Sequence, residues 1–216
     1  IIKLRRNLIV VKKRMRMSKE SIYGEYLPKL EAARDYLVKE IEIVREEMKK
    51  KYDLDPVEHL ISRIKSEESM REKCRRKGFE ETTESALTKI FDAVGIRVGC
   101  AFISDVYVIR DHLVQLPNCE LVKEKDYIKR AKDNGYRSYH MILKVWGEVY
   151  VEIQLRTISQ DTWAALEHHL YYKKEKMVDD VLIEAELKRC ADELASTDLS
   201  MQTIRDMIQA GKEEKS

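Results

Sequence analysis

Apolar residues recur at three- and four-residue spacing in two long stretches near the ends of the chain, and this spacing predicts helices there. The first helix is expected over 18–51, with a buried stripe made of Leu27, Leu30, Tyr36, Leu37, Ile41 and Val44. The last is expected over 179–211, with apolar positions at Leu182, Leu187, Leu194, Met201, Ile204 and Ile208. Because helices of this length overrun a small core, we hypothesise that they form contacts between copies of the chain.

A further helix is expected after Asp55-Pro56, because aspartate at the N-cap followed by proline at the first helical position is a helix-start signal. It is predicted to continue to about Lys77 and to end at Gly78. Its expected buried face consists of Val57, Leu60, Ile61 and Ile64. Shorter helices are predicted over 84–91, over 104–116 with Ser104 as the N-cap, and over 157–173.

Strict alternation of apolar and polar residues over 149–156 (VYVEIQLR) predicts a strand with one buried face. Val149, Val151, Ile153 and Leu155 form the apolar face, and Tyr150, Glu152, Gln154 and Arg156 form the other. Further strands are predicted over 94–102, 120–125 and 138–146, with a tight turn at Gly147. The fold class is therefore α+β: a mixed sheet of four to five strands surrounded by helices, with long helices at both ends.

Composition narrows the class of protein. Charged residues make up 37% of the 216 residues, yet the net charge is only +2, so bulk charge argues against a nucleic-acid-binding domain and any basic site must be local. No apolar run reaches the ~18 residues that span a membrane. The cysteines show no CxxC spacing, which argues against zinc and disulfides and favours a reduced, cytoplasmic protein; they are Cys74, Cys100, Cys119 and Cys190.

The first 17 residues carry basic side chains on both sides of a short apolar patch. No small-residue cleavage site follows the patch, so a signal peptide is disfavoured. We interpret residues 1–17 as a basic N-terminal arm or an expression remnant.

Lys65, Ser69, Lys73 and Lys77 recur every four residues, so on the predicted helix they would share one face. Ammonium groups and a hydroxyl in one line suit a polyphosphate chain. A solvated helix face with intrahelical ion pairs is the alternative, and the charge pattern alone favours it.

Two carboxylates are candidates for catalysis. Asp92 stands at the entrance of a predicted strand and suits Mg²⁺, which takes one or two carboxylates plus phosphate oxygens; a plain turn aspartate is the alternative. Glu152 lies on the polar face of its strand, which is either exposed to solvent or the floor of an active site near Asp92, where Glu152 would bind metal or accept a proton. Arg97, on an otherwise apolar strand, needs a partner, either Asp92 or a ligand phosphate.

The segment 125–140 (KDYIKRAKDNGYRSYH) combines lysines, an Asn-Gly turn, a tyrosine and a histidine. Lysines suit phosphates and a tyrosine face suits a nucleobase, although an ordinary surface loop has similar composition. His140, taken alone, is more often a core histidine bonded to backbone. The His168-His169 pair lacks a third metal ligand, and there is no Walker A motif.

Five segments, in order, resemble the RelA/SpoT family of alarmone synthetases, and within it the small stand-alone members. The resemblance covers about 54–173 and rests on SRIKSEES…EKCRRKG, FDAVGIRV, KDYIK…NGYRSYH, VEIQLRT and WAALEHHLYYK. It implies a nucleotidyltransferase-like synthetase domain over 18–175 and an oligomerising helical segment over 176–216, in a homotetramer. The implied reaction is Mg²⁺-dependent transfer of pyrophosphate from ATP to the 3′-hydroxyl of GTP or GDP, giving (p)ppGpp and AMP.

The same resemblance implies roles for individual residues. Glu152 would assist deprotonation of the 3′-hydroxyl, and Asp92 and Glu152 would hold the metal. The implied ATP contacts are Arg63 and Arg97 on the adenine, and Lys65, Ser69, Lys73, Arg76 and Lys77 on the phosphates. The implied guanosine-nucleotide contacts are Lys125, Lys132, Asn134, Tyr136 (stacked on guanine), His140 and Gln154.

One segment departs from the family pattern. Small synthetases commonly carry prolines where this chain has Arg130-Ala131-Lys132-Asp133, so we expect a less pre-organised loop and leave open the preference among GTP, GDP and GMP. No His-Asp dipeptide is present, and we expect no hydrolase activity. Two alternative functions remain. One is a toxic relative that acts on tRNA 3′ ends or makes adenosine alarmones, and the other is a silent nucleotide- or RNA-binding module. Regulation by an alarmone or by single-stranded RNA also remains open.

Overall fold

A five-stranded sheet forms the centre of the computed structural model, which describes residues 21–171 and 180–213. Its strand order is β1-β2-β5-β4-β3. The β2–β5 pair is parallel and the other pairs are antiparallel, so the sheet is mixed, as predicted. The strands are β1 (Val57–Ile64), β2 (Val94–Cys100), β3 (Cys119–Asp126), β4 (Tyr139–Val145) and β5 (Val149–Thr157).

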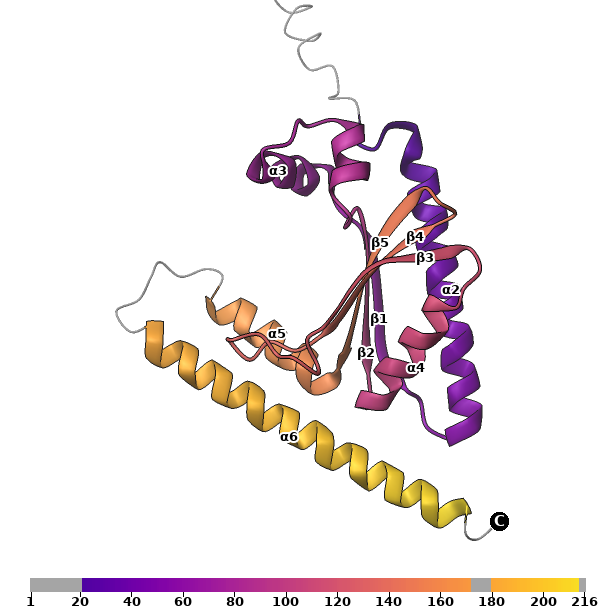
Figure 1. Cartoon of the computed structure of the whole chain (residues 1–216), viewed down its shortest axis with the longest axis vertical. Helices are drawn as coiled ribbons and strands as arrows, with labels where there is room; N and C mark the ends of the chain where they lie inside the picture. The colour runs from indigo at the N-terminus through magenta and orange to yellow at the C-terminus, as the bar shows by residue number, and fades with distance from the viewer. Residues whose placement is uncertain (1–20, 172–179, 214–216) are drawn as a thin grey trace, which may run out of the picture.

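Helices α2 (Leu27–Tyr52) and α4 (Ile103–Val114) cover one face of this sheet (Figure 1). Leu37 of α2 and Ile109 of α4 are fully buried together with the strand residues Met141 and Ile153. At one end of the sheet lie α3 (Glu67–Lys77) and the short helical turn η2 (Ser85–Lys89). At the other lie α5 (Ile158–Tyr171) and the long α6 (Asp180–Glu213).

The first helix begins later than predicted. A turn and the short helix η1 (Gly24–Tyr26) precede Leu27, and Pro28 occupies the first turn, where its missing N–H costs no hydrogen bond. The stripe is confirmed, with Leu30, Leu37, Ile41 and Val44 buried and Leu27 and Tyr36 partly buried. Ser18–Glu20, the proposed arm 1–17, and the predicted boundary between 173 and 179 lie outside the described residues.

The single helix predicted from Pro56 to Lys77 is wrong. Asp55 does accept a hydrogen bond from the Val57 N–H (3.1 Å), but the chain then pairs along β2 as the edge strand β1. Sheet pairing outweighs the local helix signal here because Val57, Ile61 and Ile64 are β-branched and fit a pleated strand. Lys65 therefore precedes the helix α3, and the proposed four-residue stripe does not include it.

Two other predicted starts change in detail. Ser66 is the true N-cap of α3, since its Oγ accepts a hydrogen bond from the Ser69 N–H (3.3 Å). Ser104 is not an N-cap, because α4 begins at Ile103 and the Asp105 carboxylate accepts the hydrogen bond from the Phe102 N–H (3.1 Å). The predicted helix 84–91 is the π-helical turn η2. All four cysteines are free.

Candidate active site

The sheet face opposite α2 and α4 carries the polar residues. Residues directly opposite each other on paired strands point to the same side. The register aligns Arg97 with Gln154, Gln154 with His140 and His140 with Lys125. One face of the sheet therefore presents a row of charged and polar side chains, which are Arg63, Arg97, Glu152, Gln154, His140 and Lys125.

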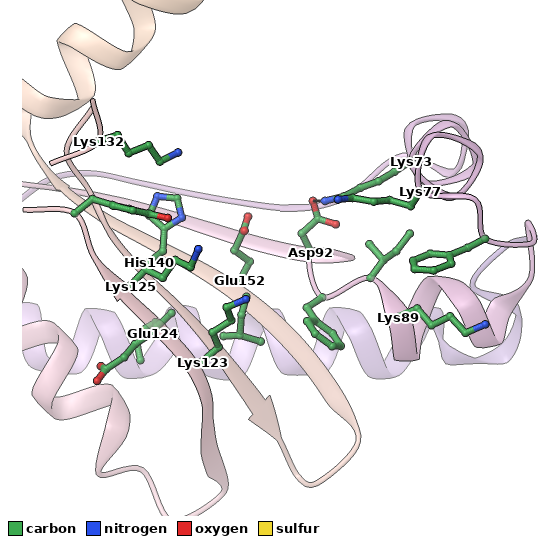
Figure 2. A pocket seen from close by; sticks show the side chains of 16 residues that line it. Lys73, Lys77, Lys89, Asp92, Lys123, Glu124, Lys125, Lys132, His140 and Glu152 are labelled. Carbon is green, nitrogen blue, oxygen red and sulfur yellow. Dashed lines mark hydrogen bonds and ion pairs between the residues drawn. The ribbon is translucent and has the colours of Figure 1, made fainter. Parts of the chain in front are cut away.

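A cavity of about 450 Å³ opens over part of this face. Figure 2 shows Glu152 between a group that includes His140 and Lys132 and a group that includes Asp92 and Lys73. Six lysines line the cavity: Lys73, Lys77, Lys89, Lys123, Lys125 and Lys132. Such a density of cations around two carboxylates suits a highly anionic ligand such as a nucleotide polyphosphate.

Asp92 pairs with one of these lysines, Lys73, and with Lys65, which is not a lining residue. Its Oδ2 lies 2.5 Å from Lys73 Nζ and 2.9 Å from Lys65 Nζ. Burial alone would raise the pKa of this carboxyl, but the hydrogen bonds from Lys73 and Lys65 outweigh burial and lower it. The other oxygen, Oδ1, is buried and has no hydrogen-bond partner among the described residues. An ionised carboxylate with one unused oxygen has a ligand position available.

Glu152 reaches the same cavity from β5. Burial, and then the nearby Asp92 carboxylate, raise the pKa of Glu152 above its ordinary value. Gln154 Nε2 donates to Glu152 Oε2 at 3.3 Å and orients it. A carboxylate with a raised pKa in a partly buried site is suited to accept a proton.

The pair Asp92 and Glu152 fits a magnesium ion. Mg²⁺ typically uses one or two carboxylates and completes its shell with water and phosphate oxygens, and here the unpartnered Asp92 Oδ1 is available beside Glu152. No group of three or more His, Cys, Asp or Glu side chains that would enclose a metal occurs in residues 21–171 and 180–213. The donor set therefore suits a metal that arrives with its own phosphate ligands.

Tyr136 lies beside the cavity, next to the lining residues Lys132 and His140. Its hydroxyl accepts a hydrogen bond from Arg156 Nη2 (2.7 Å) and so has its proton free for His140 Nε2 (2.7 Å). Burial, and then the cations Arg156 and Lys132, lower the pKa of His140 to about 4, so the imidazole is neutral and accepts that proton. Lys132 Nζ lies 4.6 Å from the centre of the Tyr136 ring. His140 is thus bonded to a side chain, where a backbone partner was expected.

Arg97 does not pair with Asp92, one of its two expected partners. Its nearest carboxylate is Asp161 of α5 (3.9 Å), which also binds Arg156 (2.9 Å) and lies 3.3 Å from His59. The Arg97 Nε is buried without a hydrogen-bond partner in the described part of the chain. Arg63 lies on the neighbouring strand, opposite Gly95. The two arginines therefore share a face at the edge of the polar row.

The structure gathers only some of the predicted residues at the cavity itself. Lys73, Lys77, Asp92, Lys125, Lys132, His140 and Glu152 line it, and Lys65 joins them through Asp92. Arg63, Ser69, Arg76, Arg97, Asn134, Tyr136 and Gln154 are not among its lining residues. Asn134 instead accepts a hydrogen bond from the Tyr136 N–H (3.1 Å), and Ser69 and Arg76 are exposed on α3.

Sequence reasoning missed several residues of the site. Arg156 is the most important, because this buried cation bonds Tyr136, Ser138, Gln154 and Asp161 at once. The alternation over 149–156 predicts that Arg156 lies on the polar face of the strand. Its role depends on its burial, which the alternation does not show. Lys123 could have been found from strand register, since it shares the face of Lys125.

Comparison with known proteins shows the family to which the chain belongs. The family model described as a region found in RelA / SpoT proteins matches residues 62–177, which is more than half of the chain. The GTP pyrophosphokinase YwaC of Bacillus subtilis is 41% identical over 74% of this chain and 79% of its own length. YjbM, a second GTP pyrophosphokinase of Bacillus subtilis, is 32% identical over 73% and 76%. The chain therefore belongs to the RelA/SpoT family.

The fold of the chain is similar to solved structures of small alarmone synthetases. Small alarmone synthetase 2 from Bacillus subtilis has a TM-score of 0.72 at 36% identity, covering 85% of this chain and 97% of that one. Small alarmone synthetase 1 from the same organism, bound to its product pppGpp, has a TM-score of 0.70 at 29% identity, covering 86% and 97%. The chain thus resembles the small synthetases along most of its length. None of the helices in the described ranges is long and apolar enough to cross a membrane.

Proposed function

We propose that the chain is a GTP pyrophosphokinase, which transfers the β,γ-pyrophosphoryl group of ATP to the 3′-hydroxyl of GTP or GDP. The 3′-oxygen forms a bond to Pβ, the bond between Pβ and the α,β-bridging oxygen breaks, and AMP leaves with that oxygen. The products are AMP and (p)ppGpp. One observation carries this proposal: Glu152 and Asp92 occupy one lysine-lined cavity in a member of the RelA/SpoT family.

On the donor side, Lys65, Lys73 and Lys77 would bind the ATP phosphates, with Arg76 and Ser69 nearby on α3. Arg63 and Arg97, on one face of β1 and β2, would hold the adenine between their guanidinium planes. Lys65 and Lys73 now neutralise Asp92, so anionic phosphates would draw these ammonium groups away and free the carboxylate. Mg²⁺ held by Asp92 and Glu152 would supply charge neutralisation at the transferred group.

On the acceptor side, Tyr136 would stack on guanine, and Lys125 and Lys132 would meet the guanosine phosphates, with Asn134 shaping the turn. Glu152 would take the proton of the 3′-hydroxyl as the 3′-oxygen attacks. Its raised pKa makes proton capture more favourable. Reactions of this type depend mainly on placement and charge neutralisation, which this set of side chains can provide.

The test is to incubate the protein with ATP, Mg²⁺ and GTP, GDP, GMP, ADP or no acceptor, and to separate the nucleotides by anion exchange. AMP together with a more highly phosphorylated guanosine product supports the proposal. Glu152→Gln should fold normally and reduce turnover by ~10²–10⁴-fold, the usual span for a general base. Glu148→Gln, which changes an exposed glutamate at the β4–β5 turn, is the matched control. Normal turnover in Glu152→Gln would remove Glu152 from the mechanism.

We also propose that the chain associates with further copies of itself, as a homotetramer, through α6. Core-facing positions of this helix include Asp198, Gln202 and Arg205, which bond Thr157, Ser104 and Asp105. Other positions on its second half expose large apolar side chains, which is unusual for a helix face in water. These residues, the α6 apolar cluster, are Leu199, Met201, Ile204, Met207 and Ile208, each about half exposed or more.

Light scattering after size-exclusion chromatography tests the assembly. Met207→Glu with Ile208→Glu should shift the particle toward the monomer mass, because both residues would place charge in an apolar contact. Ser196→Glu, an exposed position outside the cluster, controls for added charge. A monomeric unmodified chain would contradict the proposed assembly.

A further inference from the structure

Helix α6 packs against the turn that carries Tyr136. Gly135 adopts a left-handed φ of +88°, and a Cβ built on it would lie 2.6 Å from Ala191 Cβ and 3.2 Å from Lys188 Cα. Real Cβ atoms do not approach that closely. Glycine is therefore required at this position for two reasons: its left-handed backbone conformation and the close approach of α6. A loop residue with no side chain of its own is thus buried by a helix more than 50 residues later in the chain.

Arg137 fastens this contact. Its Nη1 donates to the Gly135 carbonyl (3.0 Å) and to the Ala191 carbonyl of α6 (3.3 Å). Its Nη2 donates to the Asp192 carboxylate of α6 (2.8 Å). Its side chain is 19% exposed, so the guanidinium is largely enclosed between the turn and the helix. The fork of an arginine can make these contacts together, whereas a lysine offers a single point of charge.

The turn that Arg137 binds carries Lys132 and Tyr136, two of the proposed contacts of the acceptor nucleotide. The Gly135 N–H donates to the Lys132 carbonyl (2.8 Å), and the Lys132 N–H donates to the Tyr136 carbonyl (3.1 Å). The backbone positions of Lys132 and Tyr136 therefore depend on the turn between them. These are the residues whose cation and ring lie 4.6 Å apart beside the cavity.

The helix that receives Arg137 is itself fixed to the core. Trp163 of α5 donates its indole N–H to the Leu187 carbonyl (2.8 Å), and the buried Thr157 hydroxyl bonds Asp198 (2.5 Å). These contacts lie before and after Ala191-Asp192 along α6. The helix is therefore a rigid support at the point where it meets the turn.

We propose that Arg137 is a positioning residue: with Asp192 and the α6 backbone it holds the turn 132–136 in the geometry that binds the acceptor nucleotide. The inference rests on the proposed function, in which Tyr136 and Lys132 contact the guanosine nucleotide. It assigns α6 a role in acceptor binding in addition to any role in assembly. Loss of the contact between Arg137 and α6 should weaken binding of the acceptor nucleotide and leave ATP binding unchanged.

The experiment measures KM for the acceptor and for ATP separately in Asp192→Asn and Arg137→Lys. Both variants should raise the acceptor KM about 3- to 10-fold, the effect of losing one partly exposed charged hydrogen bond, with the ATP KM within about twofold of the starting value. The matched control is Glu193→Gln, which breaks the neighbouring Arg189–Glu193 ion pair on the exposed side of the same helix. It should change neither KM.

Hydrogen exchange at the amides of 132–137 gives a readout that needs no turnover. Exchange there should be faster in Asp192→Asn and unchanged in Glu193→Gln, while the β4 amides stay protected. Faster exchange in a protein that makes no alarmone would support the contact of Arg137 with α6 as what holds the turn, and would reject the proposed function. Unchanged exchange and unchanged acceptor KM, or equal rises in both KM values, would overturn the inference.

A second pair of variants tests the close approach itself. Gly135→Ala should raise the acceptor KM more than Asp192→Asn, because it adds both backbone strain and the contact with Ala191. Adding Ala191→Gly removes that contact and should restore part of the loss. No restoration in the double variant would show that only backbone conformation matters at Gly135, and would remove the packing of α6 from the inference.

Discussion

The two sides of the cavity are stabilised in different ways. On the donor side, Lys65 and Lys73 share one carboxylate oxygen of Asp92, whose second oxygen is unpartnered. On the acceptor side, Arg156, Tyr136 and His140 form a continuous chain of hydrogen bonds. The donor side is an arrangement of ion pairs that a ligand must rearrange, whereas on the acceptor side the ring of Tyr136 is already fixed by hydrogen bonds before binding.

This difference would suit the two proposed ligands. Phosphates and a metal would bring charge to the donor side, where the charged groups can exchange partners. A nucleobase would bring a flat, mostly uncharged surface to the acceptor side, where an aromatic ring is fixed by the hydrogen bonds of its hydroxyl. The comparison predicts that donor-side changes reduce turnover strongly and acceptor-side changes reduce affinity moderately.

Among the changes confined to one side of the cavity, the largest effect is expected for Asp92→Asn. Removal of the carboxylate charge eliminates one of the two groups suited to the metal and leaves Lys65 and Lys73 beside each other without their counter-ion. Turnover should fall by about 10²–10³-fold, the range for loss of one electrostatic group, and the Mg²⁺ dependence should move to higher concentration. Steady-state rates across a magnesium titration measure both, with Asp53→Asn at the exposed end of α2 as the control. Full turnover at saturating Mg²⁺ would contradict the donor-side assignment.

A smaller effect is expected for Tyr136→Phe. The ring remains for stacking, but His140 Nε2 loses its partner and Arg156 Nη2 keeps only its bond to Gln154, at a cost of about 1–3 kcal/mol for buried groups. We expect the acceptor KM to rise about 10-fold with little change in the ATP KM, as kinetics with each substrate varied would show. Tyr127→Phe keeps a neighbouring ring of the same aromatic group and serves as the control. Equal changes in both KM values would mean that the two sides are not separable.

The free energy of unfolding should depend on pH through His140 on the acceptor side. The pKa of His140 is lowered from 6.5 to about 4, so between these values the unfolded chain binds a proton that the folded protein does not. Stability is therefore fully present above pH 6.5 and falls as pH decreases to about 4, by on the order of 3 kcal/mol. Glu152, with its raised pKa, acts in the opposite direction, since the folded protein gains its proton first as pH falls.

Denaturant unfolding of Glu152→Gln from pH 7 to pH 4 removes the opposing contribution of Glu152. Adding His140→Gln to that protein should flatten the slope over this range. A slope that is unchanged would show that His140 does not carry the pH dependence.

The smallest effect is expected for Asp133→Ala. This exposed carboxylate precedes Asn134 in the acceptor loop, where it would repel a phosphate weakly through water. Its removal should lower the KM about twofold for GTP and less for GMP, and the gain should vanish at high salt. An unchanged ranking of GTP, GDP and GMP at low salt would exclude Asp133 from acceptor selection.

Periodicity alone was enough for part of this molecule and misleading for another part. The alternation over 149–156 predicted both the strand and its polar face, because a strand with one buried face must alternate. The apolar spacing after Pro56 predicted a helix, yet the chain forms an edge strand. Both conformations bury some of the same residues, and pairing with β2 decided between them.

The amino-acid sequence by itself determined the class of this protein. Motif order and residue type identified the family, placed Glu152 on a polar strand face and marked Asp92, the lysines and Tyr136 as candidates, because these properties depend on local spacing. Only the tertiary structure decided that Arg156 supports Tyr136, that Lys65 and Lys73 meet on Asp92, and that α6 covers Gly135. Those contacts join residues 19 to 56 positions apart, and the fold of the chain, which no local pattern encodes, brings them together.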